Sequence, residues 1–164
     1  RILKMRKVIA NSTPLIALNK IGKLDLLKEV YGEIIIPYAV YEEIILDSNK
    51  VSNDFIGESN FISIKRIKNE EAKRLFVTSL HKGEVEVMIL AKEIDADICV
   101  IDDLLARKYA KYYNLNITGT IGVLLKAKEL DVIAEIKPIM DELIDSGIYI
   151  DTKLYNRVLE IAKE

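Results

Sequence analysis

The sequence lacks the residues on which several common enzyme chemistries depend. Among its 164 residues it has one cysteine, Cys99, and one histidine, His81. A disulfide within the chain and a zinc site built from several cysteines are therefore excluded, as is a metal site built from several histidines. A Ser–His–Asp mechanism is disfavoured, because His81 would have to be its base. Cys99 lies in an apolar run at residues 98–101, so we expect it to be a small buried hydrophobic residue.

Long apolar runs and an excess of one charge are also lacking. No stretch approaches the roughly 18 apolar residues of a membrane span. The first residues, Arg1 to Lys7, are too short and too charged for a secretory signal, so we expect a cytoplasmic protein without a membrane segment. The 24 Lys and Arg residues nearly balance 26 Asp and Glu residues. This balance argues against a wholly basic nucleic-acid coat protein but allows a local basic face.

What the sequence does contain is enough apolar material for one α/β domain. Half of the residues are hydrophobic. The length is slightly above the most common domain size of about 100–150 residues, so we expect one domain. Short apolar or alternating runs predict strands at residues 7–10, 33–36, 61–67, 98–101 and 116–117. Segments with helical spacing lie between them, including one that Asn69 would cap and that would run to Leu80. This alternation predicts an α/β fold with a mainly parallel sheet.

Polar residues follow two of these strands at the point where each ends. Asn11, Ser12 and Thr13 follow the first strand, and Asp102 and Asp103 follow the strand at residues 98–101. Ligands of open α/β sheets bind at the carboxyl ends of the strands. If the two strands are neighbours, both polar groups therefore share one crevice.

Further acidic residues are candidates for the same crevice: Glu42 and Glu43 in the helix after the second strand, and Glu84 beside Gly83. Each residue also has a purely structural interpretation. Asn, Ser and Asp are common helix N-caps, Glu84 would complement a helix dipole, and the Glu42–Glu43 pair fits a solvated helix face.

A cluster of Asp and Glu from separate elements suits a hard divalent cation such as Mg²⁺ or Mn²⁺. Like charges within about 4–6 Å raise one another's pKa, so such a cluster stays ionised best around a cation. A divalent ion can activate water and stabilise charge on phosphorus. Metal-dependent phosphodiester hydrolysis therefore fits this composition, and the nearby Arg107 and Lys108 could contact phosphates.

Five segments resemble PIN-domain proteins in their order and spacing. They lie at residues 8–16 (VIANSTPLI), 36–44 (IPYAVYEEI), 83–91 (GEVEVMILA), 100–107 (VIDDLLAR) and 117–124 (ITGTIGVL). The last of these fits a poorly characterised prokaryotic subgroup related to the ribonucleases of toxin–antitoxin pairs. The resemblance implies a PIN-like domain over residues 6–146, with a C-terminal helix at 147–164 packed on it or extending it.

The resemblance implies a three-layer α/β/α fold with a central, mainly parallel sheet. It also implies a metal-dependent endoribonuclease in which acidic residues hold Mg²⁺ or Mn²⁺. Many relatives are toxins of toxin–antitoxin pairs and many form dimers, so RNA, an antitoxin protein and a second copy of the chain are the implied partners.

Carried over position by position, the family's four acidic sites fall on Asn11, on Glu43 with Glu42 adjacent, on Glu84, and on Asp103 or Asp102. Beside these family positions, Ser12 and Thr13 could contact phosphate or orient the metal ligands, and Arg107 and Lys108 would position the RNA backbone as further substrate contacts. Asn11 departs from the family pattern, because its amide can ligate a cation but carries no charge. The alternative is therefore a catalytically impaired module that binds RNA or protein. A phosphoaspartate enzyme ranks low, because Asn11 cannot be the nucleophile.

Overall fold

The computed structural model describes residues 6–48, 54–76 and 79–164, and its centre is a sheet of five parallel strands. The strands are β1 (Val8–Ala10), β2 (Ile34–Pro37), β3 (Ile62–Lys65), β4 (Ile98–Val100) and β5 (Ile117–Thr118), in the order β3-β2-β1-β4-β5. Ile9 in the middle strand is opposite Ile35 on one side and Cys99 on the other. Cys99 is buried as expected, and desolvation raises the pKa of its thiol to about 12.

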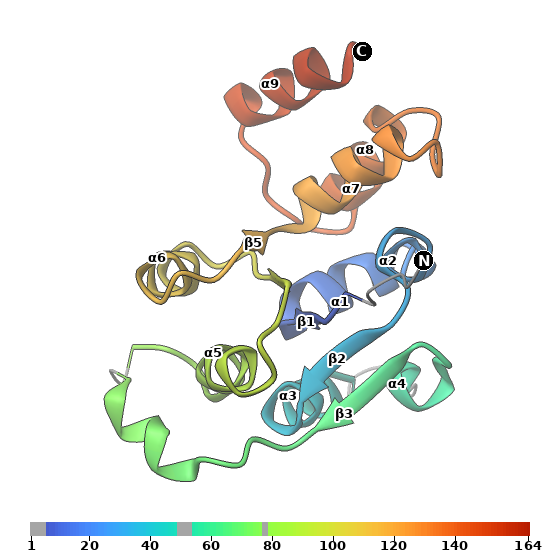
Figure 1. Ribbon diagram of the computed structural model, residues 1–164. Coiled ribbons are helices and arrows are strands. Elements are labelled where there is room, and N and C mark those ends of the chain that lie inside the picture. Colours follow the sequence, from blue (N-terminus) through green and yellow to red (C-terminus); the bar gives the residue numbers. More distant parts are fainter. Residues whose placement is uncertain (1–5, 49–53, 77–78) are drawn as a thin grey trace, which may run out of the picture.

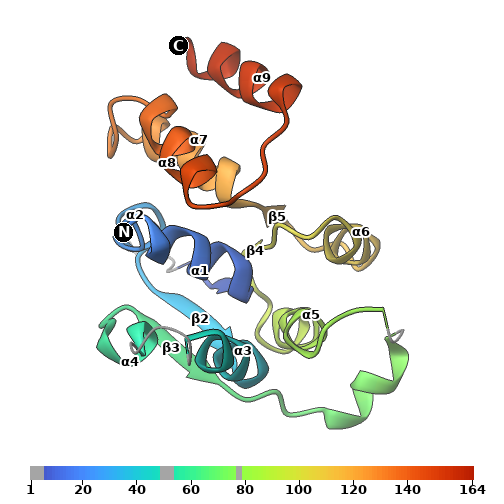
Figure 2. The ribbon, with the colours of Figure 1, turned by 180° about the vertical axis from the view of Figure 1, so that it is seen from behind.

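Helices surround the sheet on both sides, which gives the predicted three-layer α/β/α fold (Figures 1 and 2). They are α1 (Ser12–Lys20), α2 (Asp25–Tyr31), α3 (Tyr38–Ser48), α4 (Phe55–Glu58), α5 (Lys82–Ile94), α6 (Leu104–Tyr112), α7 (Thr120–Glu129), α8 (Lys137–Asp145) and α9 (Thr152–Ala162). Helices α3 and α5 pack on each other and on β2, while α2 packs on α7. Within the described ranges, no helix has the length and apolar character needed to cross a membrane.

One predicted helix is much shorter than expected. Asn69 does act as an N-cap, since its side chain accepts a hydrogen bond from the Ala72 amide at 3.3 Å, but it opens only a 3₁₀ helix, η1 (Glu70–Leu75). None of the residues of η1 is buried. A short helix with no buried face lacks the tertiary packing that stabilises most helices. The rest of the predicted span includes residues 77–78, which lie outside the described residues.

The three C-terminal helices share a second hydrophobic cluster with the first two helices. Leu124 of α7, Met140 of α8 and Val158 of α9 are buried together with Ala17 of α1 and Leu26 of α2. Figure 2 shows α7, α8 and α9 stacked above α1 and α2. The main cluster instead surrounds the sheet, so α1 contributes to both.

The carboxylate of Glu164 connects helices of this second cluster. It accepts hydrogen bonds from the amides of Ile136 at 2.7 Å and Lys137 at 3.0 Å and from Lys128 Nζ at 2.8 Å. Desolvation acts to raise the pKa of Glu164, but these hydrogen bonds together outweigh it and lower the pKa to about 2. Glu164 thus occupies the start of α8, where a negative charge is favoured.

We therefore expect Glu164→Gln to destabilise the fold by about 1–2 kcal/mol at neutral pH, because charge-assisted hydrogen bonds are replaced by neutral ones. The folded-state pKa lies below the ordinary value, so the stabilisation is complete above about pH 5 and is lost as pH falls toward 2. Thermal unfolding of both proteins from pH 7 to pH 3 measures this difference. A gap that stays constant over that range would contradict the assignment.

Candidate functional site

The candidate site lies where the order of the strands changes direction. From β1 the chain adds β2 and β3 on one side, whereas β4 and β5 lie on the other side. Such a switch point in a parallel sheet leaves a crevice at the carboxyl ends of the strands. The Asn11 amide, just after β1, donates a hydrogen bond to the Val100 carbonyl of β4 at 3.0 Å. Strands β1 and β4 are thus neighbours, which meets the condition under which the polar residues that follow them lie together.

Asn11 is buried and caps helix α1. Its Oδ1 accepts a hydrogen bond from the Ser12 amide at 2.9 Å. Asn11 thus acts as a helix N-cap, which was its structural interpretation. In this role it still lies at the switch point. The neighbouring Thr13 is exposed in the first turn of α1.

Glu43 is held by two donors from two other helices. Its Oε1 accepts a hydrogen bond from the Gly83 amide at 2.7 Å, and its Oε2 accepts one from the Ser12 hydroxyl at 2.8 Å. A Cβ atom at Gly83 would collide with this carboxylate, so the glycine permits the close approach. The adjacent Glu42 is exposed and fits the solvated-face interpretation. Ser12 therefore orients an acidic side chain in this structure.

Glu84 is the buried member of the acidic group, with 5% of its surface exposed. Its Oε1 accepts a hydrogen bond from the His81 amide at 2.9 Å in a capping box that begins α5. Desolvation raises the pKa of Glu84, and the charges of Asp103 and Glu43 raise it further against the opposing influence of His81. Three carboxylates from different parts of the chain thus share one electrostatic environment.

The second oxygen of Glu84 faces an accessible space. In the part of the chain that the structure describes, every fully buried side-chain oxygen or nitrogen has a hydrogen-bond partner. Glu84 Oε2 accepts no hydrogen bond from a described residue, so it must be reached by solvent. A carboxylate that is mostly buried but open at one oxygen is suited to receiving a cation or a proton.

The two neighbouring aspartates have different surroundings. Asp103 caps α6, because its Oδ2 accepts a hydrogen bond from the Ala106 amide at 2.9 Å, and the residue is exposed. Both oxygens of Asp102 bind Thr120 instead, Oδ1 the amide at 2.7 Å and Oδ2 the hydroxyl at 2.6 Å. Asp102 therefore joins the end of β4 to the start of α7. Asp103 retains an oxygen that accepts no hydrogen bond from the described residues.

The two basic residues suggested as phosphate contacts also differ. Arg107 Nη1 donates a hydrogen bond to the Ile101 carbonyl at 2.8 Å, so this side chain folds back on the loop after β4. Lys108 is exposed and lines a pocket on α6. Lys108 is therefore free to approach a ligand in a way that Arg107 is not.

The acidic residues have the chemistry that a divalent cation requires, but their side chains are not arranged as a metal site in this structure. Over the described ranges, no three His, Cys, Asp or Glu side chains are already grouped so that they could hold a metal ion. Carboxylate and amide oxygens are nevertheless the ligands that Mg²⁺ and Mn²⁺ prefer. One oxygen of Glu84 and one of Asp103 are free of hydrogen bonds from described residues, so each residue has an oxygen available to a cation.

Sequence reasoning did not find two residues that support the site. Glu86 is buried, accepts a hydrogen bond from the Ala39 amide at 3.1 Å and pairs with Lys73 at 3.0 Å. It thereby fixes the start of α3, which carries Glu43. The one available signal was an acidic residue in the apolar run at residues 85–91. The other residue is Thr120, the hydrogen-bond partner of Asp102. Its sequence context indicated only the cap of a helix and no contact with Asp102.

A family model described as a PIN domain matches residues 7–164. No curated protein and no solved structure matches. PIN domains are a nuclease family whose members generally depend on divalent metals. The matched region includes every strand of the sheet and all the acidic residues at the switch point. The chain therefore belongs to the PIN-domain family.

Proposed function

We propose that this protein is a metal-dependent endoribonuclease that cuts cytoplasmic RNA. Glu43, Glu84 and Asp103 would hold Mg²⁺ or Mn²⁺, with the Asn11 amide as an uncharged ligand. The observation that carries the proposal is the shared environment of the three carboxylates, in which Asp103 and Glu43 both raise the pKa of the buried Glu84. Uncompensated carboxylates in one crevice favour the binding of a cation.

Backbone amides restrain one oxygen of each proposed ligand. Gly83 holds Glu43, His81 holds Glu84, and Ala106 holds Asp103. These amides belong to the first turns of α5 and α6 or precede them, where the helix dipole favours negative charge. The same N-termini would favour the approach of a phosphate group.

The remaining roles follow from the positions of the polar side chains. The Ser12 hydroxyl orients Glu43, Thr13 is exposed to contact RNA, and Lys108 would attract the phosphate backbone. Asp102 and Arg107 would maintain the loop after β4. A bound divalent ion would supply the positive charge that activates water and stabilises the phosphate in its transition state. A role as a toxin, with an antitoxin partner and a homodimeric state, is part of the proposal by analogy with the family.

A titration of Mg²⁺ and Mn²⁺ with a mixed RNA pool tests this function directly. Wild-type protein should cleave RNA only with metal, and Asp103→Asn should lower the rate at least about 100-fold, more than the loss typical of residues that merely support ligands. Asparagine is a good N-cap, so α6 should stay folded, and unfolding curves would verify this. Equal cleavage by both proteins would contradict the assignment of Asp103.

A binding module without catalysis is the second candidate, and two observations favour it. Asn11 is uncharged and occupied as a helix cap, and among the described residues no three ligands are grouped for a metal. In that case the titration would give neither metal-dependent cleavage nor metal binding, whereas RNA or a partner protein would still bind.

A further inference from the structure

Helix α6 and its C-cap residue carry a row of large side chains that the core covers only in part, through Tyr109 and Tyr113. The row lines a pocket of about 330 Å³ and consists of Leu105, Lys108, Tyr109, Tyr112 and Tyr113, which are at positions i, i+3, i+4, i+7 and i+8 of a helix. This spacing normally marks the buried face of a helix. The face of α6 that is fully buried instead consists of Ala106 and Ala110.

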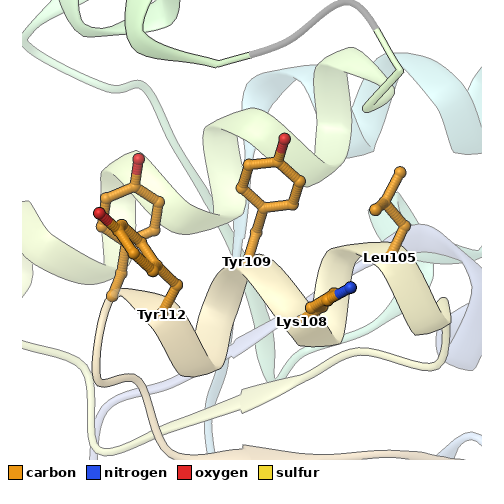
Figure 3. A pocket seen from close by; sticks show the side chains of 5 residues that line it. Leu105, Lys108, Tyr109 and Tyr112 are labelled. Carbon is orange, nitrogen blue, oxygen red and sulfur yellow. The ribbon is translucent and has the colours of Figure 1, made fainter.

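The row is aromatic and open. Tyr112 is 79% exposed, and its ring meets that of Tyr113 edge-on at 5.2 Å between centroids. The ring centroids of Tyr113 and Phe76 lie 5.5 Å apart, so Phe76 restrains the ring of Tyr113. Figure 3 shows Leu105 and Tyr109 projecting from the same side of α6, with Lys108 beside them. The pocket thus offers flat rings with a cation at its edge.

The charge of α6 favours a phosphate-bearing ligand. The helix contains Arg107, Lys108 and Lys111 and no acidic residue, although the whole chain has a net charge of -2. Tyrosine is common in the cores of protein interfaces but lysine is depleted there, so the lysine is the lining residue that favours a nucleic-acid ligand over a protein partner. Aromatic rings combined with cations are typical of surfaces that bind single-stranded nucleic acid.

We propose that the α6 row, the five lining residues named above, is a stacking surface for unpaired RNA bases next to the cleavage centre. This inference rests on the proposed function, because Asp103 caps the helix on which the row lies. At 1.5 Å per residue, Tyr109 lies about 9 Å and Tyr112 about 13 Å along the helix from Asp103. That distance corresponds to roughly three to four stacked bases at about 3.4 Å each. The row would hold the nucleotides beside the scissile phosphate.

Equilibrium binding of a fluorescent single-stranded oligouridylate, measured by anisotropy in the presence of a chelator, tests the stacking surface without cleavage. Tyr112→Ala should weaken binding about 5- to 140-fold, the effect of losing one base–aromatic stack of about 1–3 kcal/mol. Tyr112→Phe should bind within about two-fold of wild type, since it keeps the ring. Tyr149→Ala is the matched control, because Tyr149 is also exposed (88%) but lies between α8 and α9. An abasic oligonucleotide of the same length should bind weakly and be insensitive to Tyr112→Ala.

Two results would overturn the stacking surface. One is wild-type affinity of Tyr112→Ala for the oligouridylate. The other is a change in the oligomeric state of Tyr112→Ala in light scattering with RNA affinity unaltered, which would make the row a protein interface. Failure of the proposed function gives a different pattern, in which binding depends on Tyr112 but no metal-dependent cleavage occurs in the wild-type protein.

Discussion

Glu84→Gln should abolish metal-dependent RNA cleavage while leaving the fold intact. Glutamine can still accept the hydrogen bond from His81, so the capping box at the start of α5 survives. What disappears is the negative charge of the most buried carboxylate at the switch point. We expect a fall in cleavage rate of more than about 100-fold, since a direct ligand should matter more than the supporting residues whose loss typically costs 10- to 100-fold.

Thermal unfolding with and without Mn²⁺ separates a lost ligand from a damaged fold. At a metal concentration of about 100 times Kd, binding stabilises a protein by about 2.7 kcal/mol, and Glu84→Gln should lose most of this gain. Its unfolding midpoint without metal should equal or exceed that of the wild type, because burial and neighbouring charges disfavour the ionised Glu84.

Glu86→Gln is the matched control for Glu84→Gln, since both residues are buried on α5 and lie two positions apart. Glutamine can still accept the hydrogen bond from the Ala39 amide, so the start of α3 should keep its position. Only the ion pair with Lys73 is lost, so Glu86→Gln should lower stability and leave the cleavage rate within a few-fold of wild type. Full activity of Glu84→Gln, or loss of activity only in Glu86→Gln, would refute the proposed role of Glu84.

Asn11→Asp should strengthen metal binding by about 10-fold or more, because carboxylate charge is a main determinant of affinity for hard cations. Aspartate can accept the same hydrogen bond from the Ser12 amide and caps helices as well as asparagine does. Without metal, the new charge next to the Ser12–Glu43 pair should lower the unfolding midpoint. With Mn²⁺ this difference should shrink or reverse.

Isothermal titration with Mn²⁺ measures the affinity directly. Asn19→Asp is the matched control, because Asn19 is exposed near the far end of the same helix; it should leave metal affinity unchanged. If Asn11→Asp folds normally and binds Mn²⁺ no better than wild type, then Asn11 does not face the cation. The cleavage rate of Asn11→Asp would also indicate how much activity the uncharged residue costs.

The fold was largely predictable because its strands are short apolar runs. Residues 33–36 and 98–101 have the composition of strands covered on both faces. Strands of the parallel sheet form there, at Ile34–Pro37 and Ile98–Val100, so each boundary differs from the prediction by about one residue. Position after a strand also placed Asn11 and Asp103 at one edge of the sheet. These inferences need only sequence order and the geometry common to parallel sheets.

Contacts between distant side chains could not be predicted in this way. Spacing left Asp102 and Asp103 equivalent, and only the hydrogen bonds of Asp102 to Thr120 distinguish them. The pairing of Glu86 with Lys73 could not be predicted from the sequence either, since it depends on how η1 lies against α5. The length of η1 was overpredicted because a cap residue marks where a helix begins and says nothing of whether it can bury a face.

The pairing of β1 with β4 has a consequence for protein synthesis. Val8 is opposite Ile98, so β1 cannot pair with β4 until Ile98 has been synthesised, 90 residues after Val8. At about 5–20 residues per second this takes roughly 5–20 s on the ribosome. A nascent chain that has reached Ile94 carries Glu43 and Glu84 but neither Asp103 nor α6. If the proposed function is right, translation products that end before Asp103 would therefore be unable to cut the RNA around them.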